Sequence, residues 1–154
     1  MKIRNLTLAA TLIAGLAGSS APGVDAASTR FQSNSQNAFA QAAKENKLIL
    51  IDFYTDWCGW CKKLDREVYT NTLVVDAIRK GFIPLKINPE KDKRGRELAT
   101  KFGVDGFPNI VILDSQGRKV HQIAGYAPPW QFLQELKAAQ ARVKKMSKAT
   151  VQFR

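Results

Sequence analysis

The sequence is poor in cysteine, in histidine and in acidic residues. Its 154 residues include two cysteines and one histidine, and 13 aspartates and glutamates stand against 24 lysines and arginines. Two cysteines exclude a scaffold held by several disulfides, and with a single histidine they supply too few ligands for a four-coordinate Cys/His zinc site. The sequence also contains no internal repeat, low-complexity tract or interdomain linker, so we expect one domain.

Long apolar runs are absent too, apart from one near the N-terminus. Lys2 and Arg4 precede an uncharged, largely apolar stretch at 6–18. This stretch is shorter than the roughly 20 residues that a membrane-spanning helix needs, so we interpret residues 1–26 as a secretory signal peptide rather than as an uncleaved anchor. We therefore expect a mature domain over 27–154 that is periplasmic or secreted and has no stable membrane insertion.

The shortage of acidic residues leaves a net charge of +11, which indicates a basic surface. Much of this charge lies in two clusters, which are Lys91, Lys93, Arg94 and Arg96, and Arg142, Lys144, Lys145, Lys148 and Arg154. We interpret them as a solvated surface and as a helix C-terminus, whose dipole favours cations. No base-stacking or groove-reading motif supports nucleic acid binding. Steering toward acidic proteins or anionic membrane surfaces is the alternative, as for a non-catalytic basic binding module.

The rest of the sequence predicts alternating helices and strands, in a composition typical of a globular domain. Apolar periodicity, caps and turn residues predict helices at 35–46, 62–69, 71–81, 95–102 and 128–146. Apolar runs predict strands at 48–54, 82–87, 109–113 and 119–124, with a hairpin turn at 114–117. This order predicts an α/β fold whose central sheet is parallel first and antiparallel at one edge, with helices on both faces.

Cys58 and Cys61 carry the strongest chemical signal, because they stand three residues apart where a helix is expected to start. Residues so spaced share one helix face and can close a small disulfide ring. Cys58 faces unpaired backbone N–H groups and the positive end of the helix dipole, so we expect it to be the attacking thiolate and Cys61 the resolving thiol. An inert staple and a copper or iron–sulfur half-site shared between two chains are the alternatives, and His121 lies too far along the chain to support a metal.

The segment at 52–62, DFYTDWCGWCK, resembles the active-site segment of the thioredoxin superfamily. A buried strand precedes the cysteines, and Gly-Phe-Pro follows at 106–108. The likeness covers essentially the whole mature domain. It is greatest to secreted thioredoxin-like proteins and to the C-terminal periplasmic domain of transmembrane thiol:disulfide interchange reductases, through 54–58, 114–117 and 125–126. The resemblance implies a thioredoxin-like fold and disulfide exchange that needs no bound cofactor.

The resemblance also implies roles for four residues outside the cysteine pair. Asp52 matches the buried acid that assists deprotonation of the resolving cysteine, and a lone carboxyl among apolar residues has a raised pKa that suits a proton acceptor. A strand-end acid that reaches solvent is the alternative. Lys86 matches a lysine often paired with that acid, or is a solvated strand residue. Pro108 falls where the family has a cis-proline opposite the disulfide, and Phe107 would present its backbone to the substrate.

The residues around the cysteines bear on substrate and direction. Trp57, Gly59 and Trp60 form the expected docking surface for an unfolded or extended polypeptide. Gly59 and Trp60 differ from the Gly-Pro pair of cytoplasmic thioredoxins and from the histidine-containing pairs of strong oxidants. Because a histidine would add thiolate stabilisation, its absence favours a reductant.

We therefore expect an exported enzyme that reduces the disulfides of other exported proteins, with a transmembrane thiol:disulfide reductase as its electron donor. An oxidase or isomerase of secreted proteins is the second possibility. Isomerases usually dimerise, and no segment of this sequence indicates dimerisation, so we expect a monomer.

Overall fold

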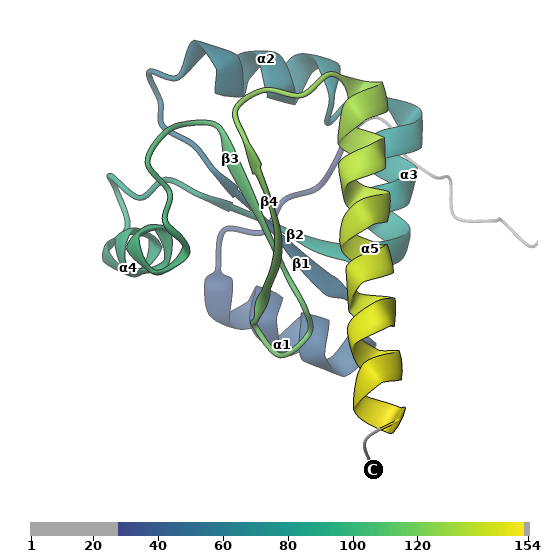
Figure 1. The fold of residues 1–154 in the computed structure, drawn as a ribbon. Coiled ribbons are helices and arrows are strands. Elements are labelled where there is room, and N and C mark those ends of the chain that lie inside the picture. The colour runs from purple at the N-terminus through teal and green to yellow at the C-terminus, as the bar shows by residue number, and fades with distance from the viewer. Residues whose placement is uncertain (1–27, 153–154) are drawn as a thin grey trace, which may run out of the picture.

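A four-stranded mixed sheet forms the centre of the computed structural model, which describes residues 28–152 (Figure 1). In chain order its strands are β1 (Leu48–Phe53), β2 (Phe82–Ile87), β3 (Asn109–Leu113) and β4 (Lys119–Ala124), and their spatial order is β2-β1-β3-β4. β2 runs parallel to β1, whereas β3 and β4 are antiparallel to their neighbours. The predicted mixed sheet is confirmed, with β1 ending one residue earlier than expected.

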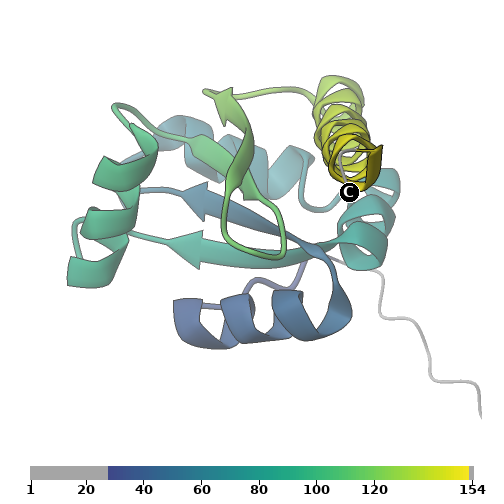
Figure 2. The same cartoon turned by 60° about the horizontal axis from the view of Figure 1, so that its bottom comes forward.

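Helices cover both faces of this sheet. Within the described residues they are α1 (Ser35–Glu45), α2 (Gly59–Glu67), α3 (Thr72–Gly81), α4 (Lys93–Phe102) and α5 (Pro129–Gln152). Side chains of α1 and α4 join one hydrophobic cluster with the sheet, and side chains of α2, α3 and α5 join the other. α3 and α5 lie side by side, as both views show (Figures 1 and 2).

The central strand β1 explains how one apolar run serves both clusters. All six of its residues are buried, and successive side chains of a strand point to opposite faces. Leu48 and Leu50 pack with α2, α3 and α5, whereas Ile49 and Ile51 pack with α1 and α4. By the same alternation Asp52 belongs to the face of Leu50, which is the face that α2 covers.

Several helices begin or end away from the expected residues. Asn34 caps α1 through its side chain, so Ser35 is the first helical residue rather than the cap. α4 begins two residues before Gly95, because the Asp92 side chain accepts hydrogen bonds from two amides of the first turn. α5 continues to Gln152, beyond the last residue of its apolar stripe.

A short N-terminal segment, residues 29–32, runs along the outer edge of β2. Gln32 forms an isolated parallel bridge to Leu85. The Gln32 amide donates to the Pro84 carbonyl and the Lys86 amide donates to the Gln32 carbonyl, both at 2.9 Å. The sequence pattern did not predict this contact.

The signal peptide expected at residues 1–26 lies outside the described residues. From residue 28 to residue 152, no helix combines the length and the apolar character that crossing a membrane requires.

Candidate active site

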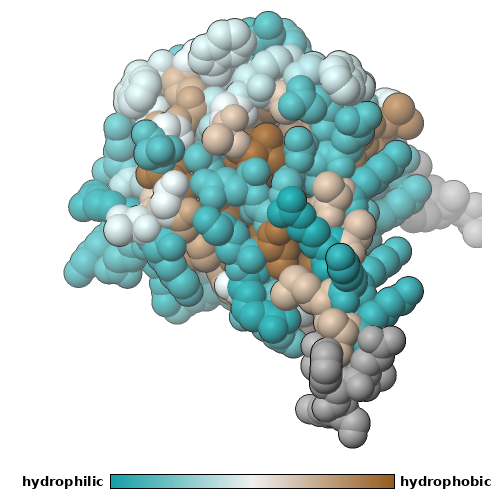
Figure 3. All heavy atoms as spheres, in the orientation of Figure 1, coloured by the Kyte–Doolittle hydropathy of each residue, from teal (hydrophilic) through white to brown (hydrophobic). Residues whose placement is uncertain are grey.

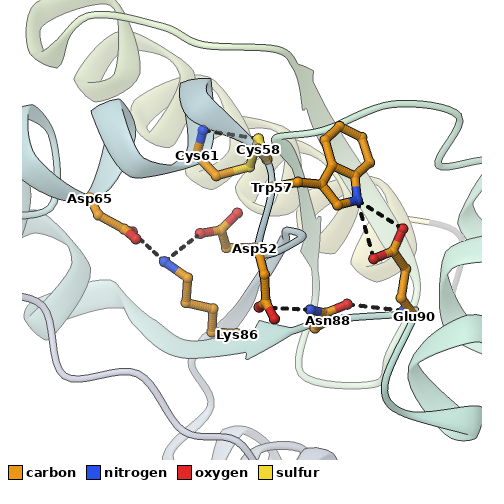
Figure 4. Close-up of a disulfide and its surroundings, with 9 residues drawn as sticks. Asp52, Trp57, Cys58, Cys61, Asp65, Lys86, Asn88 and Glu90 are labelled. Atoms are coloured by element: carbon orange, nitrogen blue, oxygen red, sulfur yellow. Dashed lines mark hydrogen bonds and ion pairs between the residues drawn. A yellow bond between two sulfur atoms is a disulfide. The ribbon is translucent and has the colours of Figure 1, made fainter.

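Cys58 and Cys61 form a disulfide at the start of α2 (Figure 4). Their Cα atoms are 5.3 Å apart, and only 4% and 2% of the two residues are exposed. α2 begins at Gly59, three residues before the expected start, because Cys58 is its N-cap. The Cys61 amide donates a hydrogen bond to Cys58 Sγ at 3.0 Å. The expected position of the pair at a helix start is confirmed.

This geometry favours negative charge on Cys58. The Cys61 amide and the positive end of the α2 dipole both point at Cys58 Sγ, and each stabilises a thiolate relative to a thiol. Cys61 lies one turn further along the helix and lacks the N-cap position. Of the two sulfurs, Cys58 is therefore the one that the fold prepares as a nucleophile.

Asp52 lies fully buried below the disulfide (Figure 4). The register of the parallel strands places Lys86 directly opposite, and Lys86 Nζ is 3.3 Å from Asp52 Oδ2. Burial raises the pKa of Asp52 to about 6, and the positive charge of Lys86 limits this rise. The alternative of an acid that reaches solvent is thus wrong. A carboxyl that titrates near neutrality is suited to accept and release a proton.

Lys86 lies between two carboxylates, those of Asp52 and Asp65 (Figure 4). Its ammonium forms an ion pair with Asp65 of α2, whose side chain is 45% exposed. Aromatic rings also surround Lys86 Nζ, at centroid distances of 5.2 Å for Phe31, 5.1 Å for Tyr54 and 5.5 Å for Tyr69. Lys86 is therefore not the freely solvated strand residue of the alternative interpretation.

Trp57 stands at one side of the disulfide with 68% of its surface exposed. Its Nε1 donates a hydrogen bond to Glu90 Oε1 at 3.1 Å, and its ring meets that of Phe107 edge to face at 6.1 Å. The hydrogen bond to Glu90 (Figure 4) and the ring contact together hold an exposed indole in a defined position.

Trp60 forms a second aromatic group with Tyr126, at a ring-centroid distance of 5.6 Å. Lys63 Nζ lies 5.3 Å from the Trp60 ring and 5.0 Å from the Tyr126 ring, and the Tyr126 hydroxyl donates to Glu67 at 2.7 Å. Trp60 is 58% exposed. Pale side chains of intermediate hydropathy gather at the end of the molecule that carries α2 (Figure 3).

Phe107 and Pro108 lie beside the loop that leads from β1 to the disulfide. The β1/β3 register pairs Phe53 with Asn109, so the two preceding residues continue alongside the end of β1. The Phe107–Pro108 peptide bond is cis. Gly59 has no heavy atom within 4 Å of the position that a Cβ would take, so the surface beside the disulfide is open there.

The sequence indicated the chemically distinctive residues and missed the partners that fix them. Asp65 could have been found, because it is four residues after Cys61 and thus on the same face of α2. No sequence pattern predicted the contributions of Phe31, Tyr69 and Glu90, because only the fold brings these residues to the site. His121, by contrast, lies in β4 and pairs with Glu135 of α5.

A disulfide at a helix start, above a buried acid and a partly buried lysine on a mixed sheet, is the arrangement of a thioredoxin-like fold. Residues 35–140 match the thioredoxin-like domain, and the chain belongs to this family.

Similar proteins share this fold and its disulfide chemistry. A putative disulphide-isomerase from Bacteroides thetaiotaomicron is 30% identical, with 75% of this chain and 93% of that chain covered and a TM-score of 0.63. The DsbH oxidoreductase shows the same fold at 19% identity, with 82% and 94% covered and a TM-score of 0.66. A protein disulfide-isomerase of Datisca glomerata is 35% identical over 58% of this chain, which is 17% of that protein. The chain thus spans less than a fifth of the length of several curated disulfide isomerases that it matches.

Proposed function

We propose that this protein is an exported thiol:disulfide oxidoreductase that reduces disulfides in other exported proteins. The proposal rests above all on Cys58 at the N-cap of α2, with the buried Asp52 and its partner Lys86 behind the disulfide. This arrangement supplies a nucleophile, a resolving thiol in Cys61 and a proton acceptor.

The reaction is a two-step exchange of disulfides. The Cys58 thiolate attacks one sulfur of the substrate disulfide, a mixed disulfide forms, and the other substrate sulfur leaves as a thiolate. Cys61 then gives its proton to Asp52 and attacks Cys58 Sγ, and the second substrate sulfur leaves as a thiolate. The substrate gains two electrons, and the protein is left with the Cys58–Cys61 disulfide.

The direction of reduction is supported by the charges around the cysteines. Neither Gly59 nor Trp60 places a cation beside Cys58, whereas Asp52 places a carboxyl on the buried side of the pair. A nearby negative charge disfavours the thiolate, which makes the dithiol a stronger reductant.

The surface around the disulfide suits an extended polypeptide. Trp57 and Trp60 offer exposed rings, and Gly59 leaves the approach open. Phe107 and Pro108 continue alongside the end of β1, where the backbone of Phe107 is the expected partner for the backbone of a bound substrate.

Each turnover consumes two electrons, which a second dithiol must restore. For a protein exported by a signal peptide at 1–26, we propose the dithiol of a transmembrane thiol:disulfide reductase as the donor. This exchange repeats the same chemistry in the opposite direction and requires no bound cofactor. We propose that the protein acts as a monomer.

Trapping tests the proposal directly. A Cys61→Ser variant lacks the resolving thiol, so mixed disulfides between Cys58 and exported proteins should accumulate in cells. The Cys58→Ser, Cys61→Ser variant is the control and should trap none. If the single variant also captures no partner, catalysis through Cys58 is wrong.

The reduction potential distinguishes a reductant from an isomerase. The isomerase is the alternative to test because several similar proteins are named disulfide isomerases. We expect a value below about −230 mV, the range of thioredoxins, rather than above about −180 mV, the range of disulfide isomerases. We also expect slow recovery of activity from a scrambled multi-disulfide protein. A potential above −180 mV with fast recovery would establish the isomerase instead.

A further inference from the structure

The N-terminal segment, residues 29–32, lies beside Lys86 and Tyr69. Besides the bonds of Gln32 to β2, the Thr29 amide donates to the Tyr69 carbonyl at 2.8 Å. Phe31 lies between Thr29 and Gln32, the two residues that bind the segment to the domain. Its side chain is partly buried against the hydrophobic cluster that contains Tyr69. The segment precedes the residues that match the family, which begin at Ser35.

Phe31 contacts the site through its ring. The ring meets that of Tyr69 at 4.7 Å and lies 5.2 Å from Lys86 Nζ. Because Tyr54 and Tyr69 come from the ends of β1 and α2, three different parts of the chain supply the rings around one ammonium. An ammonium over aromatic faces is attracted by their negative electrostatic potential.

Two carboxylates compete for this ammonium. Asp52 is fully buried, and Asp65 is half exposed and forms the shorter contact. Beside Asp65 the ammonium keeps part of its hydration, whereas pairing with buried Asp52 carries a desolvation cost, so without other contacts Lys86 would favour Asp65. The rings counter this preference because their centroids lie 5.1 to 5.5 Å from Lys86 Nζ in the position where it is 3.3 Å from Asp52 Oδ2.

We propose that Phe31 is a positioning residue of the disulfide exchange, which holds Lys86 beside Asp52 against the competing pull of Asp65. The N-terminal segment thereby controls how readily Asp52 accepts the proton of Cys61. This inference rests on the proposed function.

The charged and titratable groups that face Lys86 set the sign of the effect. They are Asp52 from β1, Asp65 from α2, and the phenols of Tyr54 and Tyr69. Burial and the Asp52 charge raise the pKa of Tyr69 well above its ordinary value, so this phenol stays neutral. When Lys86 moves further toward Asp65, Asp52 loses the positive charge that limits its pKa, and that pKa rises.

The Phe31→Leu variant tests this step because it keeps apolar cover and removes the ring. We expect the pKa of Asp52, followed in the oxidised protein by the carbon-13 shift of its carboxyl, to rise by about half to one unit. Resolution by Cys61 should then slow about threefold at pH 6 and stay unchanged at pH 8. Phe31→Tyr, which restores a ring, should behave like the unmodified protein.

A double-variant cycle distinguishes positioning of Lys86 by Phe31 from simple shielding of Asp52 from water. Lys86→Met should also raise the pKa of Asp52, and adding Phe31→Leu to it should produce no further rise. Phe39→Leu, the same change against the opposite sheet face, should leave the pKa unchanged. If Phe31→Leu does not fold, Phe31→Met provides a second side chain without a ring.

An unchanged pKa in Phe31→Leu, or the same rise with and without Lys86, overturns the positioning role. These outcomes are independent of the proposed function, because the carboxyl shift is measured without substrate. Failure of the trapping experiment, in turn, leaves the titration of Asp52 intact.

Discussion

The indole N–H of Trp57 donates a hydrogen bond to the carboxylate of Glu90, although 33 residues separate the two in the sequence. The contact joins the loop before α2 to the loop after β2. It orients an exposed tryptophan that flanks the disulfide, so a residue with no chemistry of its own defines part of the docking surface.

Removing the acceptor should weaken binding of protein substrates. We expect Glu90→Leu to raise KM for a disulfide-containing polypeptide about two- to fivefold, as loss of an exposed hydrogen bond allows, with kcat unchanged. The Glu90→Gln variant keeps an acceptor oxygen, so its KM should stay near that of the unmodified protein. A small aromatic disulfide needs no docking surface, so an equal rise in its KM would contradict this role.

Asp52→Asn should slow the resolving step, because the amide cannot accept the Cys61 proton. We expect a decrease of about a hundredfold at pH 7, the lower end of the range for proton transfer to a side chain. The rate measured by single turnover should also lose its inflection near the pKa of Asp52, about 6. Asp105→Asn, at an exposed loop position, is the control and should retain both.

The same substitution should stabilise the protein at neutral pH. The pKa of Asp52 is about 6 in the folded protein against 3.8 for an unperturbed carboxyl, so the folded state binds this proton more tightly. The resulting stability is complete below pH 3.8 and is lost as the pH rises through 6. We expect the oxidised Asp52→Asn protein to exceed the original by about 2–3 kcal/mol in urea unfolding at pH 8, with the difference vanishing toward pH 4. A difference that does not change with pH would be inconsistent with a raised pKa.

Gly95→Ala should destabilise the protein, although alanine normally favours a helix interior. A Cβ at Gly95 would lie 2.4 Å from Ile87 Cγ2, a methyl of a buried β-branched residue with little freedom to move. We expect a loss of about 1–2 kcal/mol in the free energy of unfolding. Gly106→Ala, where a Cβ meets nothing within 4 Å, should change stability far less.

The sheet could be predicted from sequence because its strands have a clear pattern of apolar residues. β1 is buried on both faces, so its residues are apolar at every position except one. The single acid at that position, Asp52, therefore stands out in the sequence. The cysteine pair predicted that a helix begins near it, but not at which residue, because Cys58 itself serves as the N-cap of α2.

The partners of these residues could not be predicted, because their proximity depends on topology. Phe31 and Asp65 are 34 residues apart in the sequence, and both reach Lys86 only when β2 pairs beside β1 and α2 folds back over the sheet. The N-cap of α1 was predicted wrongly for a local reason, whereas Asn71 caps α3 as expected. Asn34 and Ser35 are both capable caps, and the choice depends on which side chain reaches an amide of the first turn.

The bridge of Gln32 to the edge of β2 has a consequence for solubility. A sheet edge with free N–H and C=O groups pairs readily with another extended chain, and the proposed function would bring such chains to this protein constantly. Pro84 has no N–H to offer at this edge, and Gln32 already occupies the Pro84 carbonyl and the Lys86 amide. At the opposite edge, the pairing of β3 with β4 is interrupted by an irregularity at Ile112/Leu113. Both edges therefore discourage strand addition, which directs an extended chain to the disulfide rather than to the sheet.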